Sequence, residues 1–161
     1  MTKKELSINI TWDEFEMGTC RIFVETLNQY IPTVFFQDHK PKPTVTNKML
    51  AGVNDILDMD INEFDRLGEI LGVEVYQKSK IKEIHIDQDN DVFDGIYSEV
   101  IISLESNKQI GVIVKDGAFF CLNNGRYFDT LAVSEEENDA DTSKKISKEN
   151  REKILAMMLS S

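Results

Sequence analysis

Four short apolar runs between residues 81 and 122 constrain the fold more than any other feature of the sequence. The runs are residues 81–86, 97–104, 109–115 and 118–122. Their alternation of apolar and polar residues and their content of isoleucine and valine predict strands. Asp116-Gly117 separates the last two runs and is typical of a two-residue hairpin turn. Residues 81–122 are therefore predicted to form an antiparallel β-meander.

The first third of the chain also predicts strands. Residues 6–12 alternate in polarity, which predicts a half-buried strand with one apolar face made of Leu6, Ile8, Ile10 and Trp12. Residues 20–27 fit both a strand and a helix, and the preceding Gly18-Thr19 and the β-branched content favour a strand. A third short strand is expected over residues 33–37.

Two consecutive helices are predicted in the centre of the chain. Pro41 and Pro43 indicate a loop, after which Thr44 or Thr46 can cap a helix that continues to about Leu57. A turn over residues 58–62 leads to a second helix. Its apolar stripe consists of Phe64, Leu67, Ile70, Leu71 and Val75.

The sequence thus predicts an α+β fold, with an antiparallel β-sheet packed with two consecutive central helices. We expect one domain over residues 1–133 and an acidic linker over residues 134–146. A C-terminal helix is expected over residues 147–161, capped by Ser147, and it either packs on the domain or contacts a partner. Its apolar stripe consists of Ile154, Leu155, Met158 and Leu159.

The composition restricts the classes of partner. The chain has 18 lysines and arginines against 29 aspartates and glutamates, a formal net charge of −11. This balance argues against binding to nucleic acid or to anionic membranes. The absence of a secretory pattern and of a membrane-spanning apolar run predicts a cytoplasmic protein in which Cys20 and Cys121 are reduced and buried.

Motifs for metal ions and cofactors are incomplete. Asp87, Asp89 and Asp91 have the spacing of a calcium loop, but Val92 stands where that loop needs glycine. We interpret this stretch as a solvated loop. Asp58 and Asp60 have a similar spacing, which we interpret as the charged start of a helix.

Other catalytic patterns are also missing. His39 and His85 lack the spacing of a metal site, and His85 is expected to point away from the face of Ile84 and Ile86. The glycines form no phosphate-binding loop and no serine lies in a nucleophile motif. No cofactor, metal or catalytic residue is predicted, and the pattern favours a binding protein over an enzyme.

Acidic residues are concentrated in two segments. Residues 54–74 carry seven acids and one arginine, and residues 83–99 carry six acids and no lysine or arginine, so each segment has a net charge of −6. If the two segments lie side by side, they form one acidic surface that attracts a basic protein, with Phe93 as an apolar anchor. The predicted partner-binding residues are Asp58, Asp60, Asp65, Asp87, Asp89, Asp91, Phe93 and Asp94.

Two stretches resemble small acidic bacterial α+β domains of uncharacterised function, some of them associated with toxin–immunity loci. They are residues 41–57, with Pro-x-Pro-Thr followed by Met-Leu-x-x-Val-x-x-Ile-Leu, and residues 101–120, with Ile-x-Val-x-Val before Asp116-Gly117. The resemblance implies an immunity or inhibitor protein that neutralises a basic partner.

Two alternative functions come from the same sequence. One is a small hydrolase or divalent-metal-binding protein that uses the aspartate-rich loops. The other is an oligomeric scaffold that uses the C-terminal helix. The sequence does not specify the oligomeric state.

Overall fold

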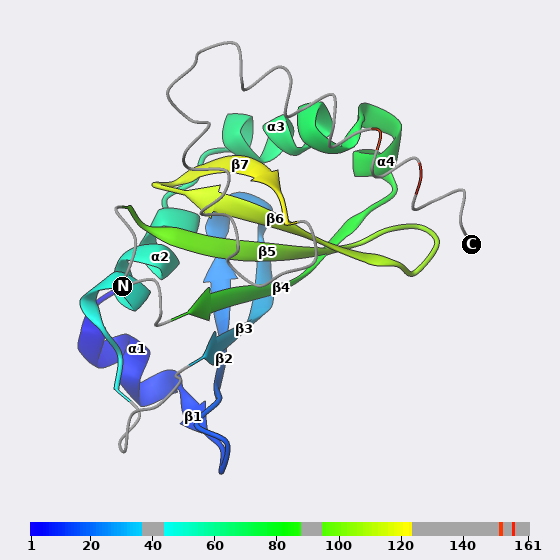
Figure 1. The fold of residues 1–161 in the computed structure, drawn as a ribbon. Coiled ribbons are helices and arrows are strands. Elements are labelled where there is room, and N and C mark those ends of the chain that lie inside the picture. The colour runs from blue at the N-terminus through cyan, green and yellow to red at the C-terminus, as the bar shows by residue number, and fades with distance from the viewer. Residues whose placement is uncertain (37–43, 88–94, 124–151, 153–155, 157–161) are drawn as a thin grey trace.

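Seven strands form one sheet. A computed structural model describes residues 1–36, 44–87 and 95–123 of the chain, together with Glu152 and Ala156. The strands are β1 (Thr11–Trp12), β2 (Gly18–Val24), β3 (Gln29–Phe36), β4 (Lys80–Asp87), β5 (Tyr97–Ser103), β6 (Gln109–Lys115) and β7 (Ala118–Leu122). The helices are α1 (Lys3–Asn9), α2 (Asn47–Leu57), α3 (Ile61–Leu71) and α4 (Val73–Gln77), and a short 3-10 helix covers Glu25–Leu27. The predicted α+β class is confirmed (Figure 1).

The order of the strands in the sheet follows their order in the chain (Figure 1). Every neighbouring pair is antiparallel except β3 and β4, which run parallel with Thr33 opposite Ile84 and Phe36 opposite Asp87. The prediction of an antiparallel sheet is therefore wrong at this pair. The physical reason is the crossover through α2, α3 and α4, which returns the chain in its original direction.

The β-meander in the second half is confirmed. Strands β4, β5, β6 and β7 pair in sequence, each antiparallel to the next. At the turn between β6 and β7, Asp116 has φ 48° and Gly117 has φ 81°. Two consecutive residues with positive φ form the turn that matches the twist of the flanking strands, and aspartate followed by glycine tolerates this conformation best.

The two central helices are also confirmed, and their caps explain where they begin. The side chain of Thr46 accepts a hydrogen bond from the backbone N–H of Met49 at 3.1 Å at the start of α2. The side chain of Asp60 accepts one from the backbone N–H of Glu63 at 2.9 Å at the start of α3. Gly72, with φ 90°, separates α3 from the short α4.

The strand predicted over residues 6–12 is wrong for residues 6–9, which belong to helix α1, whereas Thr11–Trp12 form strand β1. Leu6 is buried, but Ile8 is 73% exposed, so the expected single apolar face does not exist. The helix is stabilised by a capping box in which Thr2 and Glu5 bond each other's backbone N–H groups. The local capping interaction prevails over a short pattern of alternating polarity.

The other early strands are confirmed with different limits. Strand β2 ends at Val24, before the 3-10 helix, and β3 already begins at Gln29.

The two cysteines are present as free thiols. The side chain of Cys121 is buried and that of Cys20 is partly buried.

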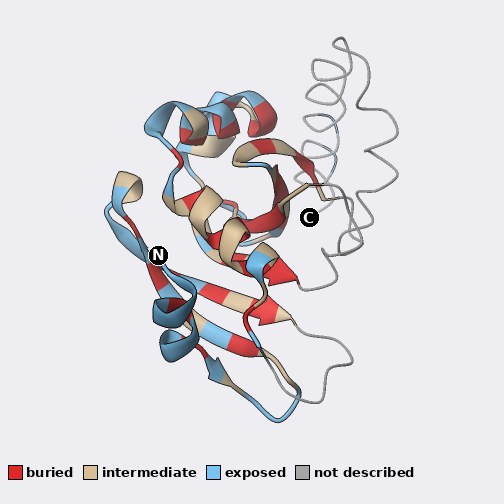
Figure 2. Ribbon diagram, turned by 90° about the vertical axis from the view of Figure 1, so that its left-hand side faces the viewer, coloured by how far each residue is buried: buried red, intermediate tan, exposed pale blue. Residues whose placement is uncertain are grey.

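The main core lies between the helices and one face of the sheet. Helix α1 contributes Leu6, α2 contributes Met49, Val53 and Ile56, α3 contributes Phe64, Leu67, Ile70 and Leu71, and the strands contribute alternate residues such as Val112 and Val114. Figure 2 shows buried and exposed residues interspersed along the helices. A second, smaller cluster of buried residues consists of Tyr97, Ile113 and Cys121.

Some sequence predictions lie outside the described residues. These are the acidic linker over residues 134–146 and, apart from Glu152 and Ala156, the helix over residues 147–161. Within the part of the chain that the structure describes, no helix is long and apolar enough to span a bilayer.

Candidate functional site

Two aspartates at the end of α2 meet a third from a distant part of the chain. Asp55 lies in the last turn of α2, Asp58 is its C-cap, and Asp116 lies in the turn between β6 and β7. The turn packs against the helix closely: a methyl group built on Gly117 would lie 3.9 Å from Cγ of Asp55. We call Asp55, Asp58 and Asp116 the aspartate cluster.

Asp116 also connects this cluster to the second acidic segment of the sequence. Its backbone N–H donates to the carbonyl oxygen of Ile96 at 2.8 Å, and its Oδ1 accepts from the N–H of Ile96, also at 2.8 Å. A methyl group built on Gly95 would lie 3.5 Å from both carboxylate oxygens of Asp116. The end of the segment over residues 83–99 therefore lies next to the end of α2, so the two acidic segments approach each other here.

The cluster concentrates negative charge at a partly buried position. The pKa of Asp55 is raised above its ordinary value, first by burial and then by the negative charges of Asp116 and Asp58. Among the described residues, no lysine, arginine or amino terminus forms an ion pair with any of the three carboxylates. Carboxylates that repel one another without a cation create a local negative potential suited to a cationic ligand.

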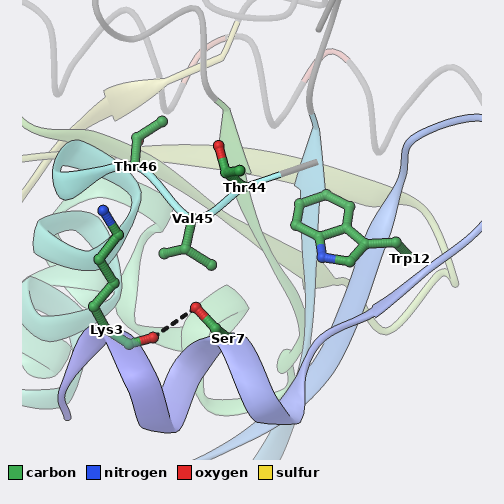
Figure 3. A pocket seen from close by; sticks show the side chains of 6 residues that line it. All are labelled: Lys3, Ser7, Trp12, Thr44, Val45 and Thr46. Atoms are coloured by element: carbon green, nitrogen blue, oxygen red, sulfur yellow. Dashed lines mark hydrogen bonds between the residues drawn. The ribbon is translucent and has the colours of Figure 1, made fainter. Parts of the chain in front are cut away.

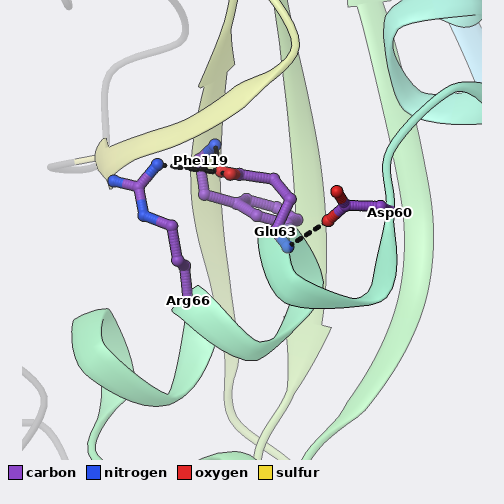
Figure 4. Close-up of polar contacts among 4 residues, drawn as sticks. All are labelled: Asp60, Glu63, Arg66 and Phe119. Atoms are coloured by element: carbon purple, nitrogen blue, oxygen red, sulfur yellow. Dashed lines mark hydrogen bonds and ion pairs between the residues drawn. The ribbon is translucent and has the colours of Figure 1, made fainter.

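Of the predicted partner-binding residues, Asp58 belongs to the cluster, whereas Asp60 and Asp65 are exposed on α3. Asp60 caps that helix (Figure 4). Asp65 lies near Tyr76 of α4, whose pKa is raised first by burial and then by the charge of Asp65.

The other predicted residues contribute less to a surface. Asp87 is only 5% exposed at the end of β4. Asp89, Asp91, Phe93 and Asp94 lie outside the described residues. Asp116 is not among the residues predicted from the sequence, because Asp116-Gly117 indicates only a turn. A turn signal gives no indication of which helix the turn will contact.

A second polar group lies on the face of the sheet opposite the central helices. Nε2 of His85 lies 2.6 Å from Oε2 of Glu83, and Nδ1 lies 3.9 Å from Oε1 of Glu99. Asn123 donates to Oε2 of Glu99 at 2.5 Å. Burial raises the pKa of Glu99, although the hydrogen bond from Asn123 and the charge of His85 oppose the rise. The expected orientation of His85, away from the main core, is confirmed.

A pocket of about 610 Å³ lies beside helix α1 (Figure 3). Its lining consists of Lys3, Ser7, Trp12, Thr44, Val45 and Thr46. Trp12 lies opposite Gly18 in the β1–β2 pair, and a side chain at Gly18 would collide with the indole ring, since a methyl group there would lie 2.8 Å from Cζ3. The hydroxyl group of Ser7 donates to the carbonyl oxygen of Lys3 at 2.7 Å, so it is already used within α1. The pocket contains none of the carboxylates described above.

Within the three described ranges, no group of three or more histidine, cysteine, aspartate or glutamate side chains has an arrangement that could hold a metal ion. Comparison of the chain with protein-family models, curated proteins and solved structures found no match. The aspartate cluster is therefore assessed on its own geometry and charge.

Proposed function

We propose that this chain is a cytoplasmic, non-enzymatic binding protein that captures a basic protein partner through an acidic surface centred on the aspartate cluster. The observation that carries the proposal is the convergence of Asp55, Asp58 and Asp116 at a partly buried position, where burial first and then the two neighbouring charges raise the pKa of Asp55. The fold holds Asp116 of the β6–β7 turn beside two carboxylates at the end of α2, although like charges repel one another. A partner's lysines or arginines would relieve their repulsion on binding.

The resemblance to domains from toxin–immunity loci is compatible with this mechanism. An immunity protein of this kind would act by occlusion, placing its carboxylates over cationic residues around the partner's active site. Asp60 and Asp65 on α3 would form the outer part of the surface. Such exposed charges accelerate association more than they strengthen the final complex, and salt reduces their effect.

A pair of charge-matched variants tests the proposal. The affinity-tagged full-length chain is used to capture proteins from an extract of its source cells, in parallel with Asp55→Asn/Asp58→Asn and with Glu14→Gln/Glu25→Gln. Both variants remove two negative charges, but Glu14 and Glu25 are exposed on other parts of the molecule. We expect a salt-sensitive basic protein to be captured by the original chain and the control, and to be lost with the cluster variant.

The association rate then measures the electrostatic contribution. With the captured protein, the rate should fall about 10-fold between 50 and 300 mM salt, and the Asp55→Asn/Asp58→Asn variant should show a smaller fall. If both variants bind equally well and with the same salt dependence, the aspartate cluster is not the binding surface.

A further inference from the structure

The face of the sheet opposite the central helices carries a buried apolar cluster. Val112 and Val114 of β6 point into the main core, so Ile113 between them points to the other face. There it meets Tyr97 and Cys121, and these three side chains are 0%, 4% and 2% exposed. This degree of burial is typical of the interior of a protein and not of a sheet surface in contact with water.

The described helices do not account for this burial. Leu6 of α1, the buried residues of α2 and α3, and Val75 and Tyr76 of α4 all pack in the main core. Among the described residues, the smaller cluster includes none from these helices, and the partly buried apolar side chain packed against it is that of Phe120 in β7. Side chains on neighbouring strands enclose Ile113 laterally, but a fully buried residue on one face of a sheet also needs a layer above it.

We infer that residues 147–161 of the same chain dock on this face of the sheet and cover Tyr97, Ile113 and Cys121. The linking residues 124–146 are long enough to reach any part of the sheet, since an extended chain spans about 3.3 Å per residue. The occupant is therefore available within the molecule at high effective concentration.

Two described residues of this segment indicate which side would face the sheet. Glu152 and Ala156 both have helical backbone and both are exposed. Residues four apart lie on the same side of a helix, so these two mark its outer side. Ile154 and Met158, two and six residues after Glu152, fall on the opposite side of an ideal helix. Of the apolar residues in the predicted stripe, Ile154 and Met158 are therefore the two that we expect to face the sheet.

The charges of the two surfaces are complementary. The sheet face carries Glu83, Asp87 and Glu99 beside the apolar cluster, and the amino group of Lys115 lies over the rings of Tyr97 and Phe120. The segment over residues 144–153 has five lysines and arginines and two glutamates, a net charge of +3 in a chain whose total is −11. A basic amphipathic helix is therefore complementary to an apolar cluster that has carboxylates beside it.

Reactivity of the Cys121 thiol tests the inference in the full-length protein. In a Cys20→Ala background, Cys121 should react slowly with a thiol reagent. Ile154→Asp/Met158→Asp places charges on the apolar side of the segment and should accelerate the reaction by at least about 10-fold. Ala156→Asp, which adds a charge to the outer side, is the matched control and should leave the rate unchanged. Equal rates in all three proteins would overturn the inference.

A second measurement avoids substitutions. In the unmodified protein with labelled methyl groups, nuclear Overhauser effects should connect Ile113 with Ile154 or Met158. The absence of any such contact would refute docking even if the Asp variants failed to fold. A mixture of differently labelled chains identifies the donor: contacts found only between chains would replace the inference by an exchange of segments between two copies.

Discussion

The backbone N–H of Phe119 in β7 donates a hydrogen bond to Oε1 of Glu63 in α3 at 2.6 Å (Figure 4). The two residues are 56 positions apart, and the aromatic rings of Phe119 and Phe64 pack edge to face beside this bond with their centroids 5.7 Å apart. Strand β7 is the last strand of the sheet. The carboxylate of Glu63 therefore supplies an acceptor for a strand that pairs with one neighbour, β6, among the described strands.

Glu63→Ala should destabilise the protein by about 1–3 kcal/mol, because it leaves a partly buried N–H without its acceptor. Glu63→Gln retains an acceptor and should cost less. Arg66→Ala serves as the control: it removes the exposed ion pair with Glu63 at 3.0 Å and should change stability by less than about 1 kcal/mol. Urea unfolding measures all three. A Glu63→Ala effect no larger than that of Arg66→Ala would contradict the assigned role.

The buried carboxyl group of Glu99 should make stability depend on pH. Its pKa in the folded protein is raised by burial, so the folded state binds the proton more tightly than the unfolded state. The stabilisation by the neutral form is complete below about pH 4.3 and is lost as the pH rises through the folded-state pKa. Glu99→Gln should therefore gain stability relative to the original chain between pH 4 and pH 7.

Denaturant unfolding at several pH values checks this expectation, with Glu105→Gln as the control. Glu105 is exposed and pairs with Lys78 at 3.4 Å. Its variant should follow the pH profile of the original protein. If the Glu99→Gln profile is also parallel to the original, the ionisation of Glu99 has no influence on folding.

Asp116→Asn should lower the pKa of Asp55 towards its ordinary value, because it removes one of the two negative charges that raise it. Asparagine tolerates positive φ and keeps an oxygen for the N–H of Ile96. Stability at pH 7 should be unchanged or higher, since ionised Asp55 experiences less repulsion. Asp116→Ala loses the acceptor and should cost about 1–2 kcal/mol. Carboxyl NMR titration measures the pKa of Asp55, and thermal unfolding measures the stability. An unchanged pKa of Asp55 would show that the charge of Asp116 does not act on Asp55.

The thiol of Cys20 should be unreactive at neutral pH. Burial raises its pKa to about 11, and only the thiolate is a nucleophile. In a Cys121→Ala background, its alkylation rate should therefore increase about tenfold per pH unit between pH 7 and pH 10. A plateau in the rate near pH 9 would show that the thiol has an ordinary pKa.

Features governed by neighbouring residues could be predicted from the sequence. The limits of β6 and β7 follow from two apolar runs around Asp116-Gly117, and α2 begins at the threonine expected to cap it. The misassigned α1 is also a local case. Thr2 and Glu5 have the spacing of a capping box, a local signal for the start of a helix, whereas the strand was predicted from the alternation over residues 6–12 alone.

Features that depend on distant contacts could not be predicted in this way. Neither the hydrogen bond between Phe119 and Glu63 nor the approach of Gly117 to Asp55 leaves a signal in the local sequence. Both arise because the β6–β7 hairpin folds onto α2 and α3. The sequence therefore indicated that acidic segments could form a surface, but not that a turn residue, Asp116, would bring them together.

The single parallel pairing in the sheet divides the molecule into two folding units. Within β1–β3 and within β4–β7, each strand pairs antiparallel with the next strand of the chain. Each set can therefore form through contacts between residues that are close in sequence. Joining them requires Thr33–Phe36 to pair with Ile84–Asp87 across 47 intervening residues that include three helices. We expect the β3–β4 pairing to form last during folding. Weakening it would then mainly accelerate unfolding and leave the rate of folding nearly unchanged.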